Sequence, residues 1–177
     1  MIWLSSSTIA RLRDQLRARG ERQSLVLADA TNLTPDAAEL LAASMEYGPL
    51  CEAMYLMMSA DGKISDEERA VLKGALRSLS NESLASTYIE AMLDAAAKNV
   101  ALAGREKRLG DVAAELRSDP ERAEVAFVLA AAVAFADGAI ADEENETLSE
   151  LADKLGIDEA RAEALLDAIE TDVAQGR

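Results

Sequence analysis

Two segments of the chain are apolar around most of a helical circumference, and this feature limits the possible folds more than any other. One is LCEAMYLMMSA, which begins at Leu50, and the other is PERAEVAFVLAAAVAFA, which begins at Pro120. A helix with apolar residues on every side is normally buried at the centre of a domain. The sequence therefore predicts two central helices, against which the remaining segments pack.

The composition favours helices over strands. Half of the 177 residues are hydrophobic but only 3% are aromatic, and aromatic and β-branched residues are the main strand formers. No segment alternates between polar and apolar residues with a period of two, as a half-buried strand does. We therefore predict an all-α fold, a compact bundle of about seven to nine helices with an internal pseudo-two-fold repeat.

Capping residues, glycines and prolines set the expected helix boundaries. A break is expected at Gly48-Pro49, and residues 21–33 fit either a short helix around 24–30 or an irregular connector. We assign 1–33 to an Arg-rich helical extension and 34–177 to a helical domain with repeats at about 50–103 and 120–175. The expected helices cover about residues 6–20, 34–47, 50–60, 65–80, 82–103, 105–117, 120–136, 142–155 and 158–175.

The charge of the chain is strongly negative. Eighteen Lys and Arg stand against 33 Asp and Glu, a net charge of −15. Such a surface repels phosphate groups, so neither nucleic acid nor anionic lipid is an expected partner, whereas a cation or a basic protein is. Residues 1–25 differ, because five Arg outweigh Asp14 and Glu21. A solvated basic helix face is the simpler interpretation of this stretch, and docking on an acidic surface, its own or a partner's, is the alternative.

Several classes of protein are excluded by what the sequence lacks. Without histidine there is no His general base, no His–Asp triad and no usual zinc-enzyme ligand set. Cys51 alone cannot close an internal disulfide. The sequence contains no apolar run of about 18 residues and no signal peptide pattern, so we expect a cytoplasmic protein that does not insert into a membrane.

A weak internal repeat lies at an offset of 76 residues. The segment MMSADGKISDEERAVLKGALRSL (57–79) aligns without a gap with VAFADGAIADEENETLSELADKL (133–155). Each copy follows one of the two apolar helices, so we expect the two Asp-Gly loops to face one another. The matching positions are Asp61 and Asp137, Gly62 and Gly138, Ile64 and Ile140, Asp66 and Asp142, Glu67 and Glu143, Glu68 and Glu144, Leu72 and Leu148, and Leu79 and Leu155.

Each copy matches the second half of a calcium-binding EF-hand loop. Aligning the glycines puts Asp61 or Asp137 at loop position 5 and Glu68 or Glu144 at position 12, but the carboxylate of position 1 is missing. One such loop therefore offers too few oxygen ligands for calcium. Two facing loops would combine four carboxylates, which repel one another strongly unless a cation lies between them.

A metal-free interpretation of the repeat stays open beside the metal site. An Asp-Gly pair is a common turn, and Ser65-x-x-Glu68 is a capping box that opens a helix. In the second copy Ala141 cannot cap through its side chain although Glu144 is kept, and Asp142 is an alternative cap one residue later. The same acidic residues therefore fit either a helix connection or a cation site.

The repeated motif resembles the TerB family of tellurite-resistance proteins. Residues Ser59–Glu68 (SADGKISDEE) and Phe135–Glu144 (FADGAIADEE) carry the resemblance, which covers about residues 35–175. The resemblance extends to the TerB-like domain of membrane-anchored J-domain co-chaperones. It implies an all-helical fold with internal pseudo-symmetry, an acidic cluster that binds divalent cations, and a role in tellurite, metal or envelope stress.

These observations lead to one preferred function and two alternatives. The preferred one is a non-enzymatic protein that binds calcium or magnesium through Asp61, Glu68, Asp137 and Glu144, because hard oxygen ligands suit these ions. The first alternative is a metal-free acidic scaffold or adaptor for a basic or membrane-associated protein partner. The second is a two-metal hydrolase, for which no positive charge that would bind a substrate is evident beside the cluster.

Overall fold

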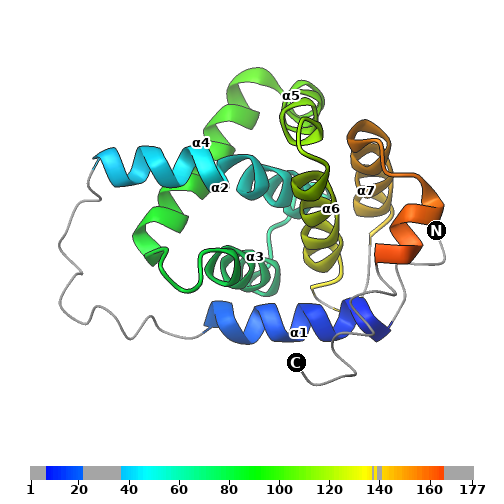
Figure 1. Cartoon of the computed structure of the whole chain (residues 1–177), viewed down its shortest axis with the longest axis horizontal. Helices are drawn as coiled ribbons and strands as arrows, with labels where there is room; N and C mark the ends of the chain where they lie inside the picture. Colours follow the sequence, from blue (N-terminus) through cyan, green and yellow to red (C-terminus); the bar gives the residue numbers. More distant parts are fainter. Residues whose placement is uncertain (1–6, 22–36, 137, 139–140, 166–177) are drawn as a thin grey trace.

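The computed structural model describes residues 7–21, 37–136, 138 and 141–165 (Figure 1). These residues form helices and connecting turns, and the described ranges contain no strand. A further helical segment begins at Glu159 and continues to residue 165, so the predicted all-α bundle is confirmed. The complete helices are α1 (Ser7–Glu21), α2 (Ala37–Met58), α3 (Asp66–Leu79), α4 (Ser86–Ala103), α5 (Arg105–Arg117), α6 (Pro120–Ala134) and α7 (Asp142–Leu155).

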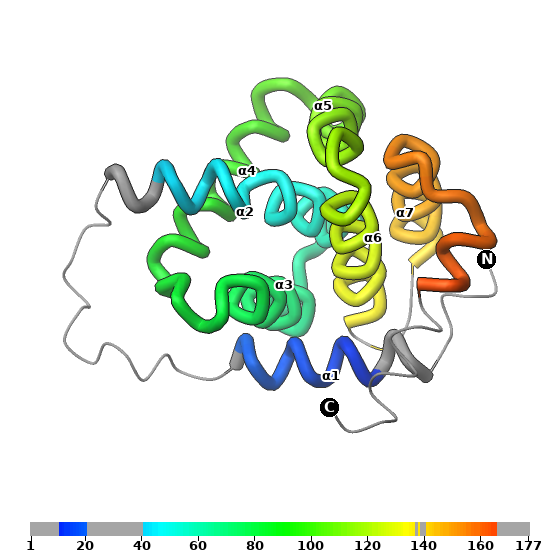
Figure 2. The backbone as a smooth tube through the Cα atoms, in the orientation of Figure 1, coloured from blue at the N-terminus to red at the C-terminus, as the bar shows by residue number. Residues whose placement is uncertain are grey.

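Helices α2 and α6 form the centre of the bundle, as their apolar sequences predict (Figure 2). They pack against each other, and α2 also contacts α3, α4, α5 and α7, while α6 contacts α1, α3, α5 and α7. Met54, Met57 and Phe127 have no exposed surface, and Cys51 is buried between its neighbours. Burial raises the pKa of the Cys51 thiol to about 12, so this cysteine is a core residue and not a reactive thiol.

The predicted break at Gly48-Pro49 is wrong, because α2 runs without interruption from Ala37 to Met58 with Pro49 inside it. Proline removes one helical hydrogen bond and is normally unfavourable there. Here Tyr47 and Leu50, on either side of Pro49, pack against the core. Arg122 Nη2 also donates a hydrogen bond of 2.6 Å to the carbonyl oxygen of Glu46, one turn before Leu50. Packing on both sides of Pro49 keeps the helix continuous, and the bond from Arg122 anchors the preceding turn.

The predicted start of α4 near Glu82 is also wrong, because α4 begins at Ser86. Asn81 and Glu82 have φ angles of 50° and 63°, which lie in the left-handed region that ends helices. The backbone N–H of Glu82 donates to the carbonyl oxygen of Arg77 at 2.7 Å and closes the end of α3. The predicted helix start at Thr34-Pro35 and the ambiguous segment 24–30 lie outside the described residues.

A buried ion pair joins α2 to α5. Glu52 is only 6% exposed, and its two carboxylate oxygens accept hydrogen bonds from Arg108 Nε at 2.7 Å and Nη2 at 2.8 Å. Asn99 of α4 adds a third donor at 3.3 Å. The Glu52 carboxylate is therefore buried together with its own countercharge.

Candidate functional site

The two Asp-Gly loops connect equivalent pairs of helices, α2 to α3 and α6 to α7. Each central helix ends in a turn in which a glycine N–H bonds back three residues, from Gly62 to Ser59 and from Gly138 to Phe135. Both glycines have positive φ, 78° and 92°, a conformation that costs glycine little. The described parts of the two loops thus share the same turn at the end of the central helix.

Each loop is followed by one buried glutamate, which lies in the first turn of the next helix. Glu68 and Glu144 are both 7% exposed. Their Oε2 atoms accept the backbone N–H groups of Ser65 at 2.7 Å and Ala141 at 2.8 Å. In the first copy Ser65 Oγ also accepts the N–H of Glu68 and completes the capping box. Ala141 has no acceptor, so the second copy retains only the half made by Glu144.

The carboxyl groups of Glu68 and Glu144 are in hydrogen-bond contact with each other. Burial raises the pKa of Glu68, and the charge of Asp61 raises it further, while hydrogen bonds from Ser65 and the contact with Glu144 oppose the rise. Two ionised carboxylates repel each other at this range, so their contact requires either a shared proton or a cation. Glu68 and Glu144, at the starts of α3 and α7, therefore lie together, whereas residues 137, 139 and 140 of the second loop lie outside the described residues.

Of the other two predicted ligands, Asp61 and Asp137, one is exposed and the other lies outside the described residues. Asp61 is exposed, and its Oδ1 atom accepts the N–H of Lys63 at 2.8 Å, which is the local turn expected of an Asp-Gly pair. Asp137 lies outside the described residues. Within the described ranges, no group of three or more Asp, Glu or Cys side chains is placed to hold a metal ion. The part of the site that can be described is thus a pair of carboxyl groups with Asp61 nearby.

The preferred interpretation of the Arg-rich segment as a solvated face is wrong for α1, which crosses and packs against α3 and also contacts α6 (Figure 1). Arg17 pairs with Glu67, the neighbour of Glu68, at 3.6 Å. Arg13 Nη1 donates to the carbonyl oxygen of Phe135 at 3.2 Å, and its guanidinium lies 5.3 Å from the ring centre of Phe135. The docking alternative is therefore the correct one, on the chain's own surface.

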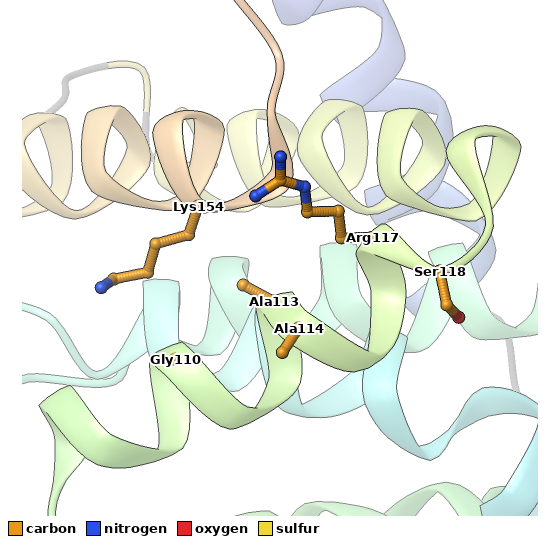
Figure 3. A pocket seen from close by; sticks show the side chains of 6 residues that line it. All are labelled: Gly110, Ala113, Ala114, Arg117, Ser118 and Lys154. Atoms are coloured by element: carbon orange, nitrogen blue, oxygen red, sulfur yellow. The ribbon is translucent and has the colours of Figure 1, made fainter.

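A surface hollow of about 520 Å³ lies elsewhere, between α5 and α7 (Figure 3). Gly110, Ala113, Ala114, Arg117, Ser118 and Lys154 line it. Figure 3 shows the charged ends of Arg117 and Lys154 well separated, and Lys154 pairs with Glu150 at 3.3 Å. The hollow includes neither of the two glutamates, so it is not part of the acidic site.

The fold and the paired loops define an all-helical protein in which two acidic corners converge. The family model described as "Tellurite resistance protein TerB" matches residues 50–167. Because this match covers more than half of the chain, the chain belongs to the TerB family. Searches of curated proteins and of solved structures gave no match, and the similarity to the J-domain co-chaperone domain stays a prediction. None of the described helices has the length and hydropathy needed to cross a bilayer.

Proposed function

We propose that this TerB-family protein binds a divalent cation, calcium or magnesium, where its two acidic loops meet. The observation that supports the proposal is the contact between the buried carboxyl groups of Glu68 and Glu144. One oxygen of each group accepts a backbone N–H, from Ser65 and from Ala141. A cation would remove the repulsion between two buried carboxylates and would stabilise the folded state.

The donors available at this corner suit a hard cation. Carboxylate oxygens are the ligands that calcium and magnesium prefer, and the chain has no histidine. Glu68 and Glu144 would hold the ion, and Asp61 and Asp137 would complete its surroundings with loop carbonyl groups and water. The role proposed for the ion is to hold the two repeats together, without any catalytic step.

The test measures calcium and magnesium binding by titration calorimetry and by the melting temperature with cation or EDTA. We expect the wild type to bind and to melt higher with the cation, because the ion binds only the folded pair. Glu68→Gln and Glu144→Gln are expected to lower the affinity at least tenfold, since each removes one of the two charges.

The matched control is Glu143→Gln, because Glu143 is an exposed neighbour of Glu144 with the same side chain. It is expected to leave the affinity unchanged. Equal calcium heats in the wild type and in the double variant Glu68→Gln/Glu144→Gln would disprove the proposal.

A metal-free acidic scaffold for a basic protein partner is the second candidate. Two observations favour it: both glutamates already cap helices, and the acidic surface beside them already holds a basic helix, α1. In that case a shared proton alone joins Glu68 to Glu144, and neither calcium nor EDTA changes the melting temperature.

A further inference from the structure

Among the described residues, the surface beneath α1 is formed by the part of the chain that matches the family. Gly74, Arg77 and Glu67 of α3, Glu82 beyond its end, and Phe135 after α6 all lie within residues 50–167. Helix α1 lies outside this range. A segment from outside the matched domain thus covers one face of it.

Helices α1 and α3 approach each other backbone to backbone. A Cβ atom added at Gly74 would lie 1.7 Å from the carbonyl oxygen of Leu16, and one added at Gly20 would lie 1.7 Å from that of Ala70. Both distances are far below any real contact, so only glycine fits at either position. The surface therefore selects a helix with a glycine four residues after its buried leucine, here Leu16 and Gly20.

The same surface fixes the direction and the charge of the helix that it binds. Arg77 Nη1 donates to the carbonyl oxygens of Arg19 at 2.7 Å and Gly20 at 3.3 Å, so a cation meets the helix where its carbonyl groups point outward. Glu67 and Glu82 then pair with Arg17 and Arg19 at 3.6 and 3.3 Å. These contacts specify a basic helix that ends over Arg77.

The closest contacts of α1 are the backbone approach at Gly20 and Gly74 and the hydrogen bonds from Arg77, whereas its apolar contacts and ion pairs are modest. Leu16 is the buried apolar side chain among residues 11–20, and Leu12 is half-buried. The side chains of Arg17, Glu67, Arg19 and Glu82 are between 39% and 57% exposed, and exposed ion pairs contribute little in salt solution. A helix with the same pattern can make the same contacts, so it can compete with α1 for this face.

We infer that the α1-binding face of α3 is a docking groove for a basic helix of a partner protein, and that α1 is its internal competitor. The partner helix has the pattern of residues 16–20, LRARG: a leucine, basic residues that face Glu67 and Glu82, and a glycine four positions after the leucine. The groove is independent of a bound cation, so its test is made in EDTA and its outcome does not depend on the cation proposal.

The test uses full-length variants and a fluorescent peptide of residues 7–21. Gly20→Ala prevents the chain's own α1 from docking but leaves the groove intact, so this variant is expected to bind the peptide at least tenfold more tightly than the wild type. Gly74→Ala blocks the groove itself and is expected to abolish binding. A peptide that carries Gly20→Ala is expected not to bind any of the chains.

Gly110→Ala is the matched control, because Gly110 also lies in a helix and a Cβ atom there meets nothing within 4 Å. It is expected to bind the peptide as the wild type does. Hydrogen exchange of Gly20→Ala and of Gly74→Ala is expected to show protection lost in α1 and kept in α6, which shows that the bundle is folded, whereas Gly110→Ala is expected to keep protection in both helices.

Three results would overturn the inference. One is equal peptide affinity of the wild type and Gly20→Ala, and another is binding by Gly74→Ala. The third is a wild-type dimer in sedimentation that becomes monomeric in Gly20→Ala, which would assign the groove to α1 of a second copy. Loss of affinity between 0.05 and 0.5 M salt is expected for the Arg–Glu pairs.

Discussion

Two buried glutamates of this protein have opposite surroundings. Glu52 is held by Arg108 and Asn99, so its charge is balanced within the chain. Glu68, which is equally buried, faces the carboxyl group of Glu144. The charge of Glu52 is neutralised by Arg108 within the protein, whereas the contact between Glu68 and Glu144 needs a proton or a cation from solution. Burial of an acidic residue alone therefore does not support a cation site; the cation site proposed above rests on the identity of the neighbour of Glu68.

The largest effect on stability is expected from breaking the ion pair between Glu52 and Arg108. Glu52→Gln leaves the Arg108 guanidinium facing a neutral amide, and removing one partner of a largely buried pair costs about 2–3 kcal/mol of the free energy of unfolding. Urea denaturation measures this loss, which calcium and EDTA are expected not to change.

Glu124→Gln is the control, because Arg161 holds Glu124 with the same two-bond geometry, at 2.6 and 2.8 Å, on the exposed surface. That variant is expected to cost less than about 1 kcal/mol. An equal loss in both variants would show that the burial of Glu52 does not matter.

A smaller effect is expected from the caps beside the two meeting glutamates. Ser65→Ala removes the hydroxyl that accepts the N–H of Glu68 and is expected to cost about 1 kcal/mol. Ala141 has nearly the same backbone angles as Ser65, so Ala141→Ser is expected to add about 0.5–1 kcal/mol. Urea denaturation of the two variants checks both signs, and destabilisation by Ala141→Ser would contradict the equivalence of the two corners.

The smallest effect is expected from the ionisation of Glu68 without a cation, because hydrogen bonds that lower its pKa partly oppose the burial that raises it. A raised pKa means that the folded state binds the proton more tightly than the unfolded state. The stability from this group is therefore complete below the ordinary pKa of 4.5 and is lost as the pH rises through the folded value.

Glu68→Gln imitates the protonated side chain and lacks this loss. In EDTA, the difference in unfolding free energy between Glu68→Gln and the wild type is expected to grow as the pH rises from 4.5 to 8. Calcium is expected to stabilise only the wild type. A constant difference across this range would show that Glu68 is not perturbed by its neighbours.

Much of the fold follows from local signals, because the apolar helices and most caps lie where the sequence predicts them. The errors occur where packing outweighs local preference. Proline normally ends a helix, but the packing around Pro49 keeps α2 intact. Glu82 suits a helix, but its left-handed backbone closes α3 instead.

The meeting of Glu68 and Glu144 was predictable because the repeat places equivalent residues at equivalent corners. The position of α1 was harder to predict, since its arginines fit water as well as an acidic surface. The available signal was Gly74, a glycine inside a strongly periodic helix, where it is unfavourable without a packing reason. Its contact with Leu16 is such a reason.

The continuity of α2 through Pro49 also limits where the chain can be truncated without loss of core contacts. The family match begins at residue 50, in the middle of a helix. A fragment that starts there would lose the carbonyl group that binds Arg122 and the ring of Tyr47 that packs on the core. A piece that keeps these contacts begins no later than Glu46, so the folding unit is longer than the stretch by which the family is recognised.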